Sequence, residues 1–215
     1  MALLYNGTDE TSSVASSAEL DLTGDGTIMF WFKTAGSLPA NDNRIWVHGN
    51  FGIIDGNFLT ADNTLTTTIF HSGGSGTVKT SVLSTSTEYH FLYRYDEGTD
   101  FKLFENGVLK NTLGSVGTIN YFGGAFNLYL AANQAGAKFI PGTFWDVRQY
   151  NRILSADEAL TIYNARGADR ITDGLVLRCL MNEGSVASSP DVSGNNNTMT
   201  HTNSPVIANV PFRHY

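Results

Sequence analysis

Acidic residues are the side chains in this sequence most able to do chemistry, because two carboxylates are enough to cleave a glycosidic bond. Such a pair must flank the bond from about 5 to 9 Å apart. Asp9-Glu10 and Asp96-Glu97 are adjacent pairs, and adjacent residues of a strand point to opposite faces. Glu105 abuts a predicted hairpin turn, and Glu158 belongs to a predicted helix cap. We therefore expect no catalytic pair and a protein that is not an enzyme.

A second candidate for chemistry lies near the C-terminus, where oxygen-bearing side chains alternate in a loop that contains Gly194. These side chains are Asp191, Ser193, Asn195 and Asn197. Oxygens from every second residue can converge on one hard cation such as Ca²⁺. The alternative is an Asn-rich turn whose side chains bond their own backbone. A calcium ion here would be structural, holding the loop in place without taking part in a reaction.

The histidines and the cysteine show no spacing typical of a reactive site. The five histidines are scattered, without H-x-H or H-E-x-x-H, so we expect no zinc site. No G-x-S-x-G elbow is present. The single Cys179 lies in the apolar run 175–181, which predicts a small core residue and no intrachain disulfide.

Sugar binding calls for exposed aromatic rings beside amide and carboxylate groups. Two stretches offer that combination, and the candidate ligand-binding residues are Trp46, His48, Asn50, Asp55, Tyr121 and Phe122. A further set of rings alternates strictly over 89–95, which places four aromatic side chains on one face of a strand. That set is either a stacking platform for sugars or a wall of the core, and the core interpretation is favoured.

The surrounding chain has the pattern of a β-rich protein. Strand-like runs recur, and Asn106-Gly107 predicts a tight hairpin because both residues tolerate a positive φ. One helix is predicted over 156–166, where Ser155 and Glu158 form a capping box and Gly167 ends the helix. The prediction is all-β: a two-sheet antiparallel jelly-roll sandwich with one short helix.

The strand expected before this helix, 142–150, contains an acidic residue among apolar neighbours. Strict alternation would place Phe144 and Asp146 on one face and Trp145 and Val147 on the other. A buried carboxylate must be paired or coordinated. Because Arg148 shares the predicted face of Asp146 and Arg152 follows closely, an ion pair and a metal site are equally open.

Composition and charge narrow the partners and the location. The chain has 215 residues and a net charge of −7, which argues against nucleic acid and anionic membranes as partners. No run approaches the roughly 20 apolar residues of a membrane span, and the first residues lack the regions of a secretory signal peptide. We expect a protein made in the cytoplasm as one domain, 1–215, with an extended tail from about residue 205.

Four segments together resemble the laminin-G-like, concanavalin A-like lectin/glucanase jelly-roll family. Residues 20–33 resemble its "fTisaWvk" strand and 89–109 its "whhva…lklyvNG" segment. Residues 142–158 resemble "G.idDvRiYNRaLs.eE", and 175–197 resemble "glv.yypLnEGsG…D.SGNgN.g". In many members the last segment precedes the first, so we predict a circularly permuted order, which adjacent termini permit. The alternative is that the tail begins a second, truncated repeat.

The resemblance adds expectations about sites. Glucanase relatives carry an E-x-D-x-x-E strand that this sequence lacks. In the family, the loop at 191–197 and the Asp of "DvRiYNR", here Asp146, look like the metal neighbourhood. The candidate calcium ligands are therefore Asp146, Asp191, Ser193, Asn195 and Asn197.

The predicted function is a non-catalytic recognition or structural module that binds a glycan or cell-surface polymer. A free-standing copy without a secretion signal resembles a phage virion component, such as a capsid decoration, head-fibre or tail-associated protein. We expect a virion-surface location after assembly or lysis, with other virion proteins as partners, and the chain as a candidate homo-oligomer. One alternative is a cement subunit without a ligand, which an exposed apolar patch or a tail after Pro205 would favour. The other is a glycan hydrolase or lyase, which a carboxylate pair across a concave sheet would favour.

Overall fold

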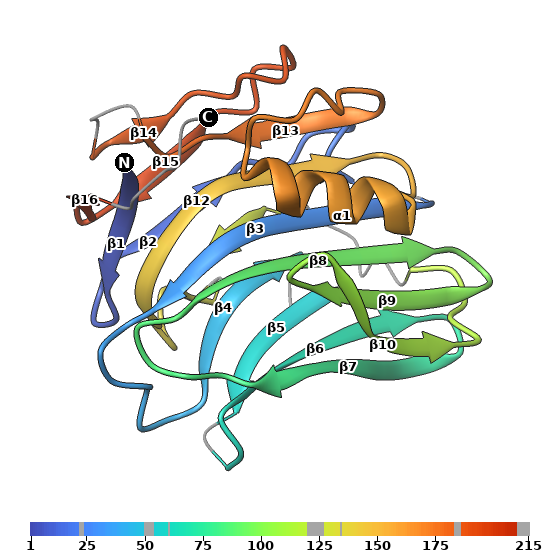
Figure 1. Cartoon of the computed structure of the whole chain (residues 1–215), viewed down its shortest axis with the longest axis horizontal. Helices are drawn as coiled ribbons and strands as arrows, with labels where there is room; N and C mark the ends of the chain where they lie inside the picture. The colour runs from blue at the N-terminus through green and yellow to red at the C-terminus, as the bar shows by residue number, and fades with distance from the viewer. Residues whose placement is uncertain are drawn as a thin grey trace.

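The protein is a sandwich of two antiparallel eight-stranded sheets with one helix outside them (Figure 1). The computed structural model describes residues 1–21, 24–49, 54–59, 61–119, 127–133, 135–182 and 186–209. The all-β jelly-roll prediction is confirmed. Within those residues, no helix has the length and apolar character needed to cross a membrane.

Sheet A contains the longest described strand, and sheet B stacks against the inner face of sheet A. The strands of sheet A, in spatial order, are β10 (Val108–Gly114), β9 (Asp100–Glu105), β8 (Glu88–Asp96), β3 (Gly26–Thr34), β12 (Pro141–Tyr150), β1 (Ala2–Asn6) and β16 (Val206–Ala208), with β13 (Leu175–Cys179) also paired to β12. Those of sheet B are β14 (Ser188–Ser189), β15 (Met199–Thr202), β2 (Thr11–Val14), β11 (Leu128–Leu130), β4 (Asn43–His48), β5 (Ile54–Leu59), β6 (Thr64–His71) and β7 (Gly74–Val82).

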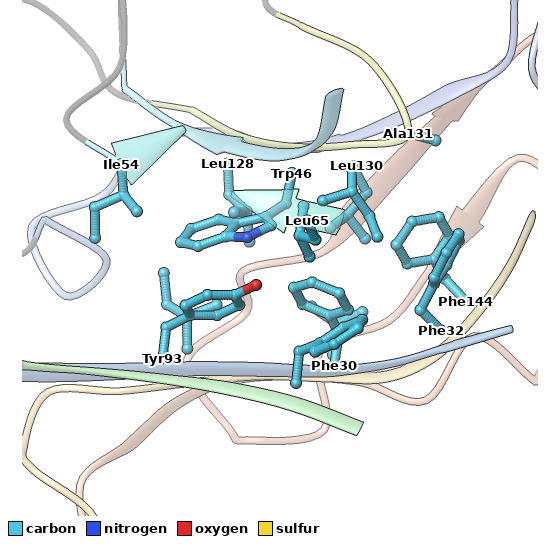
Figure 2. Packing of buried hydrophobic residues seen from close by; sticks show 14 of the residues in the cluster. Phe30, Phe32, Trp46, Ile54, Leu65, Tyr93, Leu128, Leu130, Ala131 and Phe144 are labelled. Carbon is cyan, nitrogen blue, oxygen red and sulfur yellow. The ribbon is translucent and has the colours of Figure 1, made fainter. Parts of the chain in front are cut away.

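The core forms where the inner faces of the sheets meet. Figure 2 shows Trp46 and Leu128 from sheet B pointing toward Phe30 and Tyr93 from sheet A. The four aromatic residues that alternate in β8 all lie in this core, with at most 6% of their surface exposed. The favoured interpretation of that aromatic set, as a wall of the core, is therefore confirmed. Cys179 is also fully buried, as predicted.

The C-terminal strands complete the two sheets that the N-terminal strands begin. β13 pairs with β12, β15 pairs with β2, and β16 pairs with β1. The beginning of the described chain thus lies beside its end (Figure 1). The tail of the chain is built into the same sandwich, and its permuted origin stays a prediction.

Two local predictions about turns and caps are confirmed. Asn106 and Gly107 both have positive φ angles, 54° and 78°, in the hairpin between β9 and β10. Helix α1 (Ala156–Ala165) begins with the Ser155–Glu158 capping box. It ends one residue earlier than predicted, because Arg166 already adopts a left-handed C-cap conformation.

Candidate functional site

The outer face of sheet A is closed by helix α1. Trp31 from β3 stacks on Trp145 from β12 and on Tyr163 from the helix, with ring centroids 5.7 and 5.6 Å apart. Ala159 and Ile162 of the helix are fully buried against the same cluster. This face therefore forms a second core, in which α1 packs on β3 and β12.

Strand β12 also carries a fully buried arginine, Arg148, which is paired with two carboxylates. The guanidinium of Arg148 has 0% exposed surface and donates to both oxygens of Asp146, at 2.9 and 2.6 Å, and to both oxygens of Asp169, at 2.8 Å. Arg178 also donates to Asp146, at 2.9 Å. Burial would raise the pKa of Asp146, but the two guanidinium groups outweigh it and hold this pKa below its usual range. The sequence left two interpretations open for Asp146, and the ion pair is the one observed.

A β-bulge at Asp146 interrupts the alternation of β12, so the predicted faces of this strand are wrong. Trp145 pairs with Trp31 and Arg148 with Met29, so two residues of β12 stand opposite one residue of β3. Asp146 takes a left-handed φ of 47° there, and one extra residue shifts the alternation of a strand. Phe144 and Val147 consequently both join the inner core, while Trp145 lies outside. The expected grouping of Trp145 with Val147 is wrong.

We call the outer face of sheet B the open face, although Val47 at its centre is only 4% exposed. Among the described residues, no helix or further sheet packs on it, and α1 lies on the opposite side of the molecule (Figure 1). One residue from each of the eight strands stands directly opposite the next, and together they form a line that we call the cross-strand row. It consists of Ser188, Thr200, Ser13, Tyr129, Val47, Asp55, Thr68 and Thr77.

The cross-strand row points outward because its chain neighbours point inward. Leu128 and Leu130 flank Tyr129, and both lie in the inner core. Successive side chains of a strand alternate between faces. Five of the eight row residues carry a hydroxyl group, one carries a phenol and one a carboxylate. The row therefore offers hydrogen-bonding groups and one aromatic ring, interrupted by the apolar, buried Val47 between Tyr129 and Asp55.

Three interactions hold the centre of the row in place. The amide nitrogen of Asn127 donates to the hydroxyl oxygen of Tyr129 at 3.1 Å, and the main chain of Ser16 donates to Asn127 at 3.0 Å. Arg44 pairs with Asp55, with 2.7 Å between Nε and Oδ1. Burial raises the pKa of Asp55, and Arg44 counteracts this shift.

Beside the row lies a second line of outward side chains, formed by Arg44, Asn57, Thr66 and Lys79. Arg44 is paired with Asp55, and Lys79 forms an ion pair with Asp62. The positive charges of Arg44 and Lys79 are thus balanced by their carboxylate partners. The whole chain, in contrast, carries a net charge of −7. The described part of the open face is therefore polar and close to neutral.

The predicted ligand-binding residues are only partly brought together. Asp55 lies in the cross-strand row, but Trp46 and His48 are fully buried between the sheets. The expectation that these two side chains are exposed is wrong, because they face inward opposite Gly56 and Ile54. Asn50, Tyr121 and Phe122 lie outside the described residues.

A second bulge explains which residues the sequence interpretation missed. Between Arg44 and Trp46 the register of β4 shifts by one residue, so Arg44 faces outward while Trp46 faces inward. Sequence reasoning also missed Tyr129 and Asn57. The sequence predicts a strand over 126–131, and the alternation of Leu128, Tyr129 and Leu130 within it is the signal for an outward Tyr129.

The proposed calcium loop is held by its own hydrogen bonds. The carboxylate of Asp191 accepts from the main chain of Arg178, Ser193 and Asn197 and from the hydroxyl of Ser193, at 2.8–3.0 Å. The side-chain oxygen of Asn197 accepts from Ser17 at 3.0 Å. Hydrogen-bond donors thus occupy the oxygens that a cation needs.

Asp146 is not available to complete such a site either. Both of its oxygens accept from guanidinium groups, and the described residues contain no cluster of three or more His, Cys, Asp or Glu that could hold a metal ion. The arrangement does not fit calcium, and calcium binding stays a prediction. The side chains of Asn195 and Asn197 instead donate to the main chain of Val176, as the Asn-rich-turn alternative expects.

The two stacked antiparallel sheets, with a helix on one outer face, define a lectin-like jelly-roll domain. A family model described as the concanavalin A-like lectin/glucanases superfamily matches residues 6–159. The chain belongs to this superfamily. A sequence search among curated proteins finds no significant match.

Solved structures of similar fold include binding domains. A proposed carbohydrate-binding protein from Bacteroides ovatus aligns with a TM-score of 0.68 and 17% identity, over 97% of this chain and 61% of that one. The binding domain of botulinum neurotoxin serotype G aligns with a TM-score of 0.57 and 13% identity, over 77% and 46%. The heptameric SAP-like pentraxin of Limulus polyphemus aligns with a TM-score of 0.57 and 13% identity, over 77% and 82%. The chain spans 46% and 61% of the length of the first two, and at these identities the likeness shows the fold alone.

Proposed function

We propose that the protein is a non-catalytic carbohydrate-recognition module whose binding surface is the open face of sheet B. The observation that carries this proposal is the cross-strand row, which aligns hydroxyl groups, one carboxylate and Tyr129 across seven of the eight strands. Sugars are recognised by hydrogen bonds to their hydroxyl groups and by contact of their rings with aromatic side chains. The carbohydrate-binding role proposed for the Bacteroides ovatus protein supports the same class of ligand.

The row offers binding groups but lacks the machinery of hydrolysis. Glycoside hydrolysis needs two carboxyl groups about 5 to 9 Å apart. Asp55 is the one acidic residue of the cross-strand row, and Arg44 pairs with it at 2.7 Å. We therefore propose binding without turnover, and place Asp55 as an acceptor for sugar hydroxyl groups.

A glycan array probed with the intact chain tests this function, followed by calorimetric titration of the positive glycans. We expect binding that is lost in the double variant Tyr129→Ala/Asn57→Ala. Thr112→Ala is the matched control, because Thr112 is an exposed strand residue of sheet A, and it should bind as the native chain does. Equal binding by the double variant would contradict the proposed surface, and turnover of a bound glycan would contradict the non-catalytic assignment.

We also propose that this module is displayed on a virion, as the sequence resemblance implies. A hydroxyl-rich, near-neutral face suits contact with a cell-surface polymer in solvent. Antibodies against the chain should label intact particles from the source culture in electron microscopy. Confinement of the label to soluble lysate protein would contradict this location.

A structural cement role is the second candidate, and an exposed apolar patch favours it. Leu4 of β1 and Val206 of β16 are cross-strand partners with 39% and 58% of their surface exposed. In sedimentation experiments, an assembly role predicts concentration-dependent association that Val206→Asp abolishes. A monomer at all concentrations, in the presence and absence of particles, would remove this candidate.

A further inference from the structure

We infer that Asn6 is a modification site, at which the main-chain nitrogen of Gly7 closes a succinimide ring that water then opens to aspartate or isoaspartate. The inference concerns the turn after β1 and is independent of the proposed function. The chain contains two Asn-Gly pairs, Asn6-Gly7 and Asn106-Gly107. Their surroundings differ, and only the first pair is placed to react in the folded protein.

The reaction needs only the two residues themselves and water, and asparagine is among the thermally labile residues of proteins. The nitrogen of Gly7 bonds to Cγ of Asn6, the bond between Cγ and Nδ2 breaks, and Nδ2 leaves as ammonia with the proton that Gly7 gives up. Water then adds to one of the two carbonyl carbons of the ring and breaks its bond to the ring nitrogen. One opening gives aspartate, and the other gives isoaspartate, in which the main chain passes through Cγ. No oxidant or reductant takes part.

The turn that follows β1 leaves Asn6 open to water. Asn6, Thr8 and Asp9 are exposed, and Gly7 is half-buried. Gly7 has a φ of 74°, which residues with a side chain rarely adopt. A Cβ atom at this position would come within 2.6 Å of the Pro141 ring, so the fold itself requires glycine here. The fold therefore keeps beside Asn6 the neighbour that obstructs ring closure least.

Hydrogen bonds of the turn prepare the side-chain carbonyl of Asn6 for attack. Attack at Cγ places negative charge on Oδ1, and Oδ1 already accepts from the main-chain nitrogens of Thr8 at 2.7 Å and Asp9 at 3.3 Å. Donors that point at a developing charge lower the barrier to its formation. The leaving nitrogen, Nδ2, donates to Oδ1 of Asp9 at 2.9 Å. The amide is thus held in one orientation beside the nitrogen that attacks it.

The other Asn-Gly pair lies in a closed hairpin. The main-chain nitrogen of Asn106 donates to the carbonyl of His90 at 2.8 Å, and Oδ1 of Asn106 accepts from the main-chain nitrogen of His90 at 2.9 Å. Gly107 is buried, and a Cβ atom there would lie 2.9 Å from Tyr163 and 3.1 Å from Leu160 of α1. The helix therefore shields the attacking nitrogen from water, and the hairpin must open before this pair can react.

Conversion of Asn6 adds a negative charge to a turn that is already acidic. The amide nitrogen that donates to Asp9 is replaced by a carboxylate oxygen, so two carboxylates face each other where a hydrogen bond stood. Glu10 lies beside them, is 6% exposed and accepts from the main-chain nitrogen of Asn6 at 2.6 Å. Burial, and in smaller measure Asp9, raise the pKa of Glu10, and a further carboxylate acts in the same direction.

The affected turn joins β1 to β2 at one edge of the sandwich. β1 pairs with β16, and the side chain of Asn203 donates to the main-chain oxygen of Asp9 at 2.9 Å. Isoaspartate also adds one atom to the main chain of the turn. We therefore expect conversion to loosen the edge where the first and last described strands meet.

The test is mass spectrometry of the intact folded chain after incubation at pH 6 and at pH 8.5. Proteolytic peptides that contain Asn6 and Asn106 are compared for the gain of one mass unit and for isoaspartate. We expect Asn6 to convert roughly tenfold faster than Asn106 or more, because the closed hairpin must open first, and faster at pH 8.5, because the attacking nitrogen must lose its proton. In urea the two sites should convert at similar rates. Equal rates in the folded chain, or conversion of Asn6 only in urea, would overturn the inference.

The structural consequence is measured on the aged protein itself. Anion exchange separates converted from unconverted chains of one sample, and the converted fraction should melt at a lower temperature. Asn6→Gln is the matched control, because a longer side chain cannot close the five-membered ring, and its aged sample should yield no fraction modified at this position. Equal melting temperatures of the two native fractions would overturn the expected loosening of the sheet edge.

Discussion

On the outer face of sheet A an arginine is sealed beneath a helix, whereas on the outer face of sheet B an arginine reaches solvent. Arg148 has no exposed side-chain surface and bonds two carboxylates. Arg44 pairs with Asp55 while keeping 25% of its side chain exposed. The same residue type therefore has two tasks in one sandwich. Beneath α1 it neutralises buried acids, and on the open face it sets the charge of a surface that we propose binds sugars.

The largest expected effect comes from removing each arginine in turn. Arg148→Met leaves Asp146 and Asp169 without their shared partner and should lower the free energy of unfolding by about 3–5 kcal/mol. Arg44→Met should cost about 1 kcal/mol or less, because its pair is partly solvated. Urea unfolding of both variants makes the measurement. Equal losses would break the distinction between a closed and an open face.

The closed face also makes the protein sensitive to acid through His90. Burial lowers the pKa of His90 to about 3, and the neighbouring charges of Asp146, Arg148 and Asp169 add opposing effects. The unfolded chain, with a histidine pKa of about 6.5, binds more protons, so stability is complete above pH 6.5 and falls as the pH drops toward 3. At pH 5 this histidine alone should cost about 2 kcal/mol.

His90→Phe should remove that share of the acid sensitivity. The measurement is urea unfolding of the native chain and the variant at pH 7 and pH 5. His48 and His201 are also buried, with each pKa lowered to about 4, so the variant keeps part of the dependence. An identical pH dependence in both proteins would show that His90 is not shielded by α1.

A smaller effect is expected at the start of the helix that closes sheet A. Ser155 accepts from the main chain of Glu158 at 3.1 Å, and its loss should cost about 1 kcal/mol. Thermal unfolding of Ser155→Ala, with Thr200→Ala on the open face as the control, makes the comparison. A lower melting temperature for the control than for the cap variant would contradict the assignment of stability to the covered face.

The smallest effect is expected from removing calcium. Because the carboxylate of Asp191 already accepts four hydrogen bonds, a chelator should leave the calorimetric melting temperature unchanged. Magnesium-treated protein serves as the control for ionic strength. A chelator-dependent fall in melting temperature that added calcium reverses would restore the metal site.

The sequence was informative where alternation was regular and misleading where it was interrupted. Tyr89 to Tyr95 alternate without a break, and they form the core wall that this pattern predicts. The Ser155–Glu158 box and the Asn106-Gly107 turn depend only on near neighbours, and both were predictable. The bulges at Ile45 and Asp146 depend on how β4 and β12 pair with distant strands. No local pattern marks them, and each changes which side chains face the solvent.

The pairing of β1 with β16 has a practical consequence for presenting the molecule. β1 and β16, the first and last of the described strands, pair at one edge of sheet A, so a tether or module joined next to either strand holds the sandwich at a single place. The hydroxyl-bearing surface belongs to the other layer. Immobilising the protein through either end should therefore leave that layer accessible to a dissolved polymer.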